Sequence, residues 1–128
     1  MSRVMIACAA LVCACAAQLV SAAVPRAASP KQVMAHHIAA VKKDDVDGVM
    51  EDYAVDAVLV TPTGTFIGAA RIRTFFERLA AQHRDWKDYI VTQEVEQDGV
   101  VLQKNVKTGK VEVYVVRNGK IAFQALPP

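Results

Sequence analysis

The sequence predicts an α+β domain in which a curved antiparallel sheet wraps around about three N-terminal helices. Two observations support this prediction. Apolar residues recur with helical spacing up to about residue 80, whereas they alternate with polar residues from Trp86 onward. A short apolar strand and a Pro/Gly turn interrupt the helices between Ala57 and Gly64. Helices followed by strands are typical of α+β layer folds. A curved sheet of this kind leaves a hollow that can hold a small molecule.

The first 23 residues are expected to be a secretory signal peptide. One basic residue, Arg3, precedes an apolar run from Val4 to Ala17, and small residues end the segment before Val24. The apolar run is short for a membrane span. We therefore expect a periplasmic or secreted protein that leaves the membrane once the signal is removed. A lipoprotein acylated on Cys15 is the alternative.

The remaining chain is long enough for one domain with its own core. Residues 24–30 are expected to be a flexible leader, since Pro, Ala and Ser dominate there, and residues 31–128 the domain. All three cysteines lie in the first 23 residues, which leaves no thiol for a disulfide or a metal. Once Arg3 is removed, 14 of the 15 basic residues remain, compared with 13 acidic residues. This scattered, balanced charge argues against nucleic-acid binding.

A first helix is predicted from Ser29 or Pro30 to Lys43. Its buried face is defined by an i, i+3, i+4, i+7 spacing of Met34, His37, Ile38 and Val41. His37 is therefore expected to point inward, and His36 to lie at the flank.

A second helix, Val46–Tyr53, is predicted after a cap at Asp44 or Asp45. A strand over Ala57–Thr61 and a brief strand over Thr65–Ile67 follow, separated by Pro62 and Gly64. Gly68 opens a third helix with a heavy apolar stripe that we expect to be core: Ile72, Phe75, Phe76 and Leu79.

The alternation of apolar and polar residues after Trp86 predicts an antiparallel meander. Its expected strands are Asp88–Glu96, Val100–Val106, Lys110–Arg117 and Lys120–Leu126. Turn dipeptides separate them at Asp98-Gly99, Thr108-Gly109 and Asn118-Gly119. Asp-Gly and Asn-Gly between apolar runs are strong hairpin signals.

Five short motifs lie in order along the chain: Asp47-Gly48, Tyr53-Ala54-x-Asp56-Ala57, Thr61-Pro62-x-Gly64, Gly68 with Ile72-Arg73-x-Phe75-Phe76, and residues 115–121. With the predicted elements they resemble the nuclear-transport-factor-2-like superfamily, which includes SnoaL-like polyketide cyclases, scytalone dehydratase and ketosteroid isomerase. The resemblance spans nearly the whole mature chain and implies a cone-shaped sheet around the helices. Because this fold serves enzymes, binders and scaffolds, it does not by itself give a function.

The resemblance to ketosteroid isomerase implies three site positions. Thr61 stands where those enzymes have a general-base aspartate, and a threonine hydroxyl lacks the pKa needed to take a proton from carbon. His37 replaces a tyrosine that donates to an oxyanion, and it could donate or accept. Glu112 replaces an acidic partner that an apolar site keeps neutral. Steroid-type isomerisation through Thr61 is therefore not expected.

Glu112 has two interpretations. Plain alternation makes Val111, Val113 and Val115 the core and turns Glu112 to solvent. The resemblance implies the reverse, with Glu112 and Tyr114 lining the hollow and the valines covered by a second copy in a homodimer. If His37 also points inward, the two side chains could form a pair in which each favours the ionised form of the other.

Further candidates for the wall of the hollow are Leu59, Thr61, Phe76, Trp86, Tyr89 and Tyr114. The three histidines, His36, His37 and His83, do not have the spacing of a metal site.

Three functions are compatible with these patterns. The first is an exported domain that binds a small apolar or amphipathic molecule. The second is a lyase, isomerase or cyclase that needs no cofactor and uses His37 with Glu112 as an acid/base couple. The third is an interaction module whose interior is filled by Phe76, Leu59 and Met34.

Overall fold

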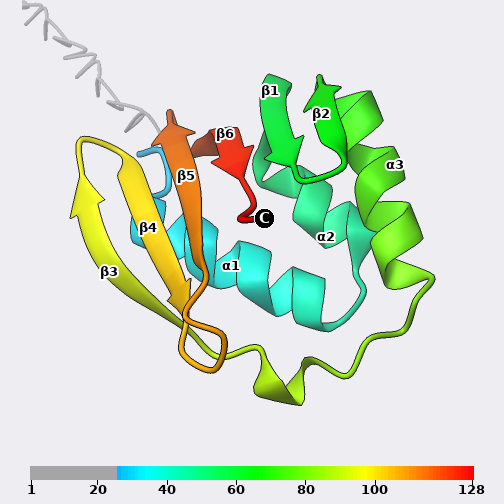
Figure 1. Ribbon diagram of the computed structural model, residues 1–128. Helices are drawn as coiled ribbons and strands as arrows, with labels where there is room; N and C mark the ends of the chain where they lie inside the picture. The colour runs from blue at the N-terminus through cyan, green and yellow to red at the C-terminus, as the bar shows by residue number, and fades with distance from the viewer. Residues whose placement is uncertain (1–25) are drawn as a thin grey trace, which may run out of the picture.

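The computed structural model describes residues 26–128 (Figure 1). The expected signal peptide, its cysteines and the first residues of the leader lie outside this range. The elements are α1 (Pro30–Lys42), α2 (Val46–Glu51), β1 (Tyr53–Thr61), β2 (Gly64–Ile67), α3 (Ala69–Ala80), the 3-10 helix η1 (Trp86–Asp88), β3 (Val91–Gln97), β4 (Val100–Asn105), β5 (Val111–Arg117) and β6 (Lys120–Ala125). No helix in this part of the chain is both long and apolar enough to span a membrane.

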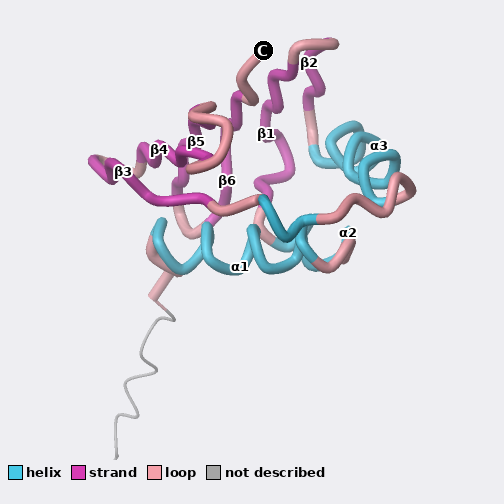
Figure 2. The backbone as a smooth tube through the Cα atoms, turned by 60° about the horizontal axis from the view of Figure 1, so that its bottom comes forward, coloured by secondary structure: helices cyan, strands magenta, loops and turns pink. Residues whose placement is uncertain are grey.

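The strands form one six-stranded sheet in the order β2-β1-β6-β5-β4-β3. The sheet is curved and open, and the three α-helices lie on one side of it (Figures 1 and 2). This arrangement confirms the predicted α+β class. One pairing differs from the expected antiparallel sheet, because β1 and β6 run parallel. Strands far apart in sequence meet there, and no turn between them could have indicated their direction.

The sequence explains where the early elements begin and end. Ser29 starts α1 with a capping box, in which its hydroxyl accepts from the Gln32 N–H at 3.3 Å and the Gln32 side chain accepts from the Ser29 N–H at 2.9 Å. The second helix ends at Glu51, earlier than predicted, and Tyr53 already belongs to β1. The chain turns there because the Asp52 carbonyl accepts the Ile121 N–H at 2.7 Å, which joins it to β6.

The strand predicted over Asp88–Glu96, which is β3 in the structure, begins later than predicted. Residues 86–88 form η1, whose first turn is capped by the Asp85 carboxylate accepting from the Lys87 N–H at 3.0 Å, and β3 starts at Val91. The 3-10 turn therefore carries Trp86 and Tyr89 outside the sheet proper.

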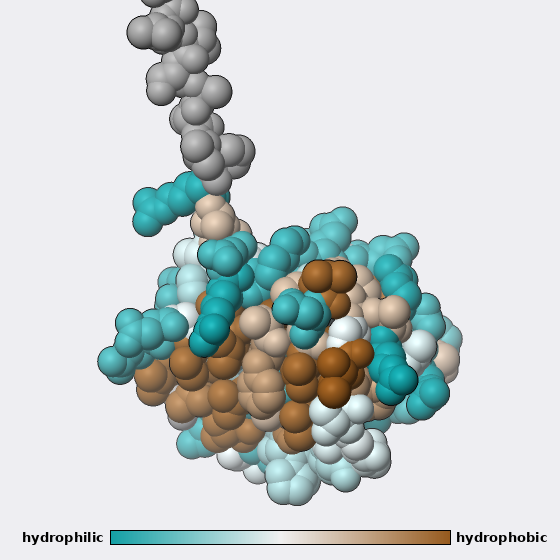
Figure 3. All heavy atoms as spheres, turned by 90° about the horizontal axis from the view of Figure 1, so that it is seen from above, coloured by the Kyte–Doolittle hydropathy of each residue, from teal (hydrophilic) through white to brown (hydrophobic). Residues whose placement is uncertain are grey.

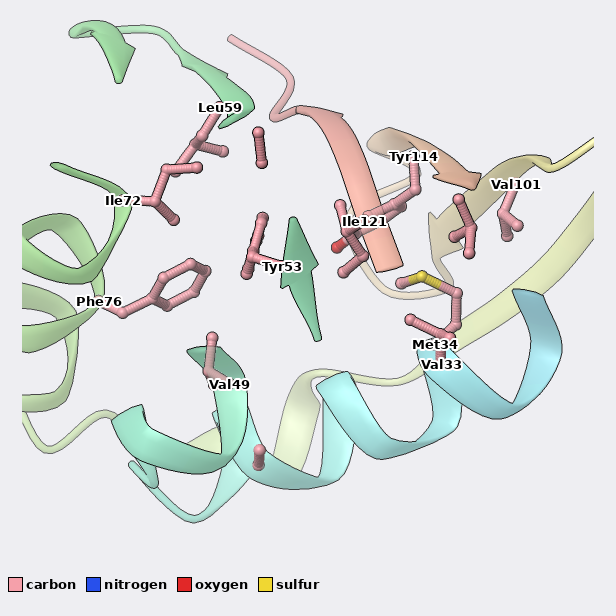
Figure 4. Close-up of a cluster of buried hydrophobic side chains, with 13 residues drawn as sticks. Val33, Met34, Val49, Tyr53, Leu59, Ile72, Phe76, Val101, Tyr114 and Ile121 are labelled. Atoms are coloured by element: carbon pink, nitrogen blue, oxygen red, sulfur yellow. The ribbon is translucent and has the colours of Figure 1, made fainter. Parts of the chain in front are cut away.

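The core lies between the helices and the inner face of the sheet (Figure 4). On α1 the buried side chains are Val33, Met34, His37 and Ala40. The predicted face also included Ile38 and Val41, which are only partly buried. The reason is that both line a cavity instead of packing against the sheet.

The outer face of the sheet, which is turned away from the helices, is apolar over its four central strands. Strand pairing aligns two neighbouring rows there: Val58, Phe123, Val115 and Val100 in one, and Val60, Ala125, Val113 and Leu102 in the other. Figure 3 shows apolar side chains gathered on the side seen from above Figure 1. On β5, Tyr114 and Val116 are the buried residues. Plain alternation, which made the valines of β5 the core, was therefore wrong.

Candidate functional site

A cavity of about 520 Å³ opens between α1, α3, η1 and the inner face of the sheet. This volume is in the usual range of small-molecule sites. Part of its wall is apolar and comprises Ile38, Val41, Phe66, Phe75, Phe76 and Leu79. The rest includes His37, Thr61, Tyr89, Glu112, Tyr114 and Gln124.

A chain of hydrogen bonds crosses the polar part of the wall. Glu112 and Tyr114 lie two residues apart on β5 and therefore share its inner face. The Tyr114 hydroxyl donates to Glu112 Oε2 at 2.5 Å, and the Tyr89 hydroxyl donates to Glu112 Oε1 at 2.9 Å. Gln124, the register partner of Tyr114 on β6, donates from Nε2 to the Tyr114 oxygen at 2.9 Å. The Tyr53 hydroxyl donates to Gln124 Oε1.

Burial and the nearby charge of Glu112 keep the phenols protonated. Burial raises the pKa of Tyr53 and of Tyr114 well above the usual value, and the charge of Glu112 raises both further. The pKa of Tyr89 is raised by the same two causes in the same order. The tyrosines are therefore neutral donors, and the Glu112 carboxylate holds two of them in place.

His37 is enclosed by aromatic rings. The rings of Tyr53, Phe76 and Tyr114 meet it edge-on, with centroids 5.5, 5.8 and 5.7 Å away. Burial lowers the pKa of His37 to about 3, and the neighbouring His36 contributes to this shift. The imidazole is therefore neutral near pH 7.

The ionised pair of His37 and Glu112 that the sequence left possible is not formed. Both side chains lie in the cavity wall, but within residues 26–128 no hydrogen bond or ion pair joins them. Two tyrosine hydroxyls already donate hydrogen bonds to the Glu112 oxygens, and burial of His37 disfavours the protonated, charged form of its imidazole.

A second carboxylate, Asp52, approaches both histidines of α1. Both of its oxygens lie 2.9 Å from His36 Nδ1, and Oδ2 lies 3.9 Å from His37 Nδ1. The hydrogen bond and then the charge of Asp52 raise the pKa of His36. The pKa of Asp52 is raised mainly by burial, against the opposing effect of His36.

The other predicted wall residues are placed as follows. Thr61, Phe76, Trp86, Tyr89 and Tyr114 line the cavity. The Thr61 hydroxyl donates to the Gly64 carbonyl at 2.9 Å, which closes the turn between β1 and β2. Leu59 lies instead in the core beside Ile72, because α3 covers that part of β1 (Figure 4).

The 3-10 helix η1 contributes Trp86 to the cavity wall. Trp86 Nε1 donates to Asp44 Oδ1 at 3.3 Å, and the Trp86 ring meets Tyr89 edge-on at 5.4 Å. In the part of the chain that the structure describes, no group of three or more His, Cys, Asp or Glu residues is placed to hold a metal ion.

Sequence reasoning did not single out Asp52, Gln124 or Gln103. Asp52 is 16 residues from His36, and Gln124 is 71 residues from Tyr53, so only the tertiary fold brings these partners together. Gln103, the register partner of Glu112, is buried, and its amide group has no hydrogen bond within the described part of the chain.

Comparisons with known proteins agree with this architecture. Residues 34–124 match the SnoaL-like domain model. An NTF2-like protein of unknown function from Cytophaga hutchinsonii has a similar structure, with 13% identity and a TM-score of 0.61 over 81% of this chain and 93% of that one. A putative polyketide cyclase from Sinorhizobium meliloti has 18% identity and a TM-score of 0.54 over 74% of this chain and 93% of that one.

A third similar structure is that of TerC co-crystallized with polyporic acid, at 18% identity and a TM-score of 0.54, covering 76% of this chain and 89% of that one. No curated protein matches the sequence. At these identities the structural likenesses show the fold alone.

Proposed function

Because the chain belongs to the SnoaL-like domain family, we propose that it binds a small amphipathic molecule in the cavity between its helices and its sheet. The observation that carries this proposal is the cavity of about 520 Å³, in whose wall aromatic and aliphatic side chains meet a cluster of oriented polar groups. Apolar pockets with a few convergent polar groups are typical ligand sites. A cavity of this size also argues against an interaction module with a filled interior.

The wall indicates the chemistry of the ligand. Phe66, Phe75 and Leu79 offer contacts to an apolar body, whereas His37 and Tyr89 offer hydrogen bonds to a polar group. Arg78 and Arg84 also line the cavity and are exposed. Within residues 26–128 neither arginine has an ion-pair partner, so an acidic group on the ligand would find its counter-charge there.

An enzyme of the lyase, isomerase or cyclase type is the second candidate. One observation favours it, namely that a neutral imidazole and protonated phenols share the cavity wall. A similar structure is a putative polyketide cyclase. However, a histidine whose pKa is about 3 is a weak base near pH 7. His37 therefore serves better as a hydrogen-bond acceptor, and binding is the first proposal.

We further propose a homodimer through the outer face and export by the N-terminal segment. The apolar rows of the outer face would be an aggregation liability on a monomer, and a second copy covers them with the same surface.

Mass spectrometry of exported protein should show a mature chain that begins near Val24. Diacylglycerol on Cys15 would overturn that expectation.

The binding proposal can be tested with the dye 8-anilino-1-naphthalenesulfonate, which is aromatic and anionic. Trp86 is the only tryptophan of the chain and lines the cavity, so energy transfer from it reports that the dye is bound to the protein, and the two variants below locate the bound dye. Val41→Phe narrows the cavity and should weaken dye binding at least about tenfold, which corresponds to about 1.4 kcal/mol of binding free energy. Val106→Phe is the control, because Val106 is 58% exposed and does not line the cavity. Absent energy transfer, or equal affinity in both variants, would refute the proposed site.

A further inference from the structure

Asp52 stands between the surface and the cavity. The His36 side chain on one side of it is 51% exposed, and the His37 side chain on the other is 3% exposed. This difference in exposure follows from helix geometry, because the side chains of adjacent helical residues point about 100° apart. One histidine of α1 can therefore face solvent while the next faces the interior, with one carboxylate beside both.

The position of Asp52 is fixed from two sides. Its backbone lies at the end of α2, with its N–H bonded to the Val49 carbonyl at 3.2 Å and its carbonyl bonded to the Ile121 N–H at 2.7 Å. Its carboxylate is held by His36 Nδ1 at 2.9 Å from both oxygens. The other charged groups that act on this pair are Lys120, Glu51 and Asp45.

The carboxylate faces one particular nitrogen of His37. Nδ1 is buried and has no hydrogen-bond partner among the residues that the structure describes, and Asp52 Oδ2 lies 3.9 Å from it. A neutral imidazole carries its proton on only one of its two nitrogens. A negative charge at this separation attracts an N–H group and repels a lone pair, and burial strengthens both effects. The proton therefore belongs on Nδ1.

We propose that Asp52, held by His36, is a positioning residue that fixes His37 in the Nδ1–H tautomer and leaves Nε2 as an acceptor toward the cavity. The two nitrogens lie on either side of Cε1 and point in diverging directions, and His37 is part of the cavity wall. The polar group of the ligand that meets His37 is then a donor, such as a hydroxyl. This last consequence rests on the proposed binding function, whereas the tautomer does not.

The charge state of the three groups agrees with this assignment. Burial among three aromatic rings keeps His37 neutral. The hydrogen bond and the charge of Asp52 raise the pKa of His36 on the solvent side, which favours the protonated form that balances the carboxylate. The carboxylate thus orients the buried imidazole without ionising it.

The tautomer can be measured directly on ligand-free protein labelled with ¹⁵N-histidine, because the nitrogen shifts and the couplings to the ring protons distinguish the two forms. The wild type should show His37 in the Nδ1–H form by roughly ten to one near pH 7. Asp52→Asn removes the negative charge and should abolish this preference. Asp47→Asn is the matched control, since Asp47 is an exposed acid of α2 paired with Arg73 at 2.8 Å, and it should leave the His37 signals unchanged.

Two results would overturn the inference: a wild-type His37 protonated on Nε2, or an unchanged tautomer in a folded Asp52→Asn protein. If Asp52→Asn does not fold, His36→Gln serves as the second variant. Gln can still donate to Asp52, so the Nδ1–H form should persist there, and its loss would also count against the inference. Failure of dye binding would refute the proposed function and leave this result intact.

Discussion

The hydrogen bond between Tyr53 and Gln124 gives the sharpest test of how the polar wall is built. Both residues are almost completely buried, and the Tyr53 hydroxyl has Gln124 Oε1 as its acceptor. Gln124→Leu removes that acceptor and leaves a buried hydroxyl unpaired. Tyr53→Phe removes the donor and leaves the amide oxygen unpaired. The double variant removes both polar groups together.

The expected magnitudes follow from this difference. A buried polar group left without its partner costs about 1–3 kcal/mol of unfolding free energy, whereas replacing both partners by apolar groups of similar shape is nearly neutral. Gln124→Leu also takes the Nε2 donor from Tyr114, but the Tyr114 hydroxyl still donates to Glu112 at 2.5 Å. We therefore expect each single variant to lose about 2 kcal/mol. The double variant should lose about as much as one of them.

Urea unfolding, followed by circular dichroism and by Trp86 fluorescence, measures the unfolding free energy of the wild type, both single variants and the double variant. The coupling between the two positions, obtained from the double-mutant cycle, should reach about 1–2 kcal/mol. Val106→Ala is a control at a largely exposed position and should change stability little. Single-variant losses that add to within about 0.5 kcal/mol would contradict a direct bond between these side chains.

Further expectations concern pH, charge and assembly. The pKa of His37 falls from 6.5 to about 3 on folding, so the folded state binds fewer protons and stability should fall as pH drops from about 6.5 toward 3, by up to about 1.4 kcal/mol per pH unit. His37→Phe should remove this slope, and a slope that persists would contradict the neutral buried imidazole. His36 acts oppositely, because its raised pKa gives stability that is lost as pH rises through the folded value. Glu112→Gln should lower the pKa of Tyr89 in a spectrophotometric titration, because the charge of Glu112 helps to raise it; an unchanged Tyr89 would count against that contact. Val113→Lys should shift a dimer to monomer in sedimentation while Val106→Lys does not, and a wild-type monomer would refute the proposed interface.

Local patterns predicted most of the elements. Helical spacing located α1 and α3, and the turn dipeptides located the hairpins of the last four strands. The i, i+2 relation of Glu112 and Tyr114 also placed them on one face of β5. Alternation alone could not tell which face is the inner one, because the outer valines are as apolar as a core. The family resemblance supplied that information.

The remaining features depend on contacts between distant parts of the chain. The parallel pairing of β1 with β6 and the bond of Tyr53 to Gln124 have no local signal. The same is true of Asp52, which meets His36 only when the end of α2 packs beside α1. The desolvation of His37 likewise requires three rings from three separate elements. The sequence does not show this enclosure, and it therefore left an ionised pair with Glu112 possible.

A crystal structure of the protein grown with 8-anilino-1-naphthalenesulfonate would test the central claim most directly. We expect the dye inside the cavity, with its aromatic body against Phe75 and Phe76 and its sulfonate toward Arg78 or Arg84. A dye bound elsewhere on the surface, with the space beside His37 closed by protein side chains, would contradict the account.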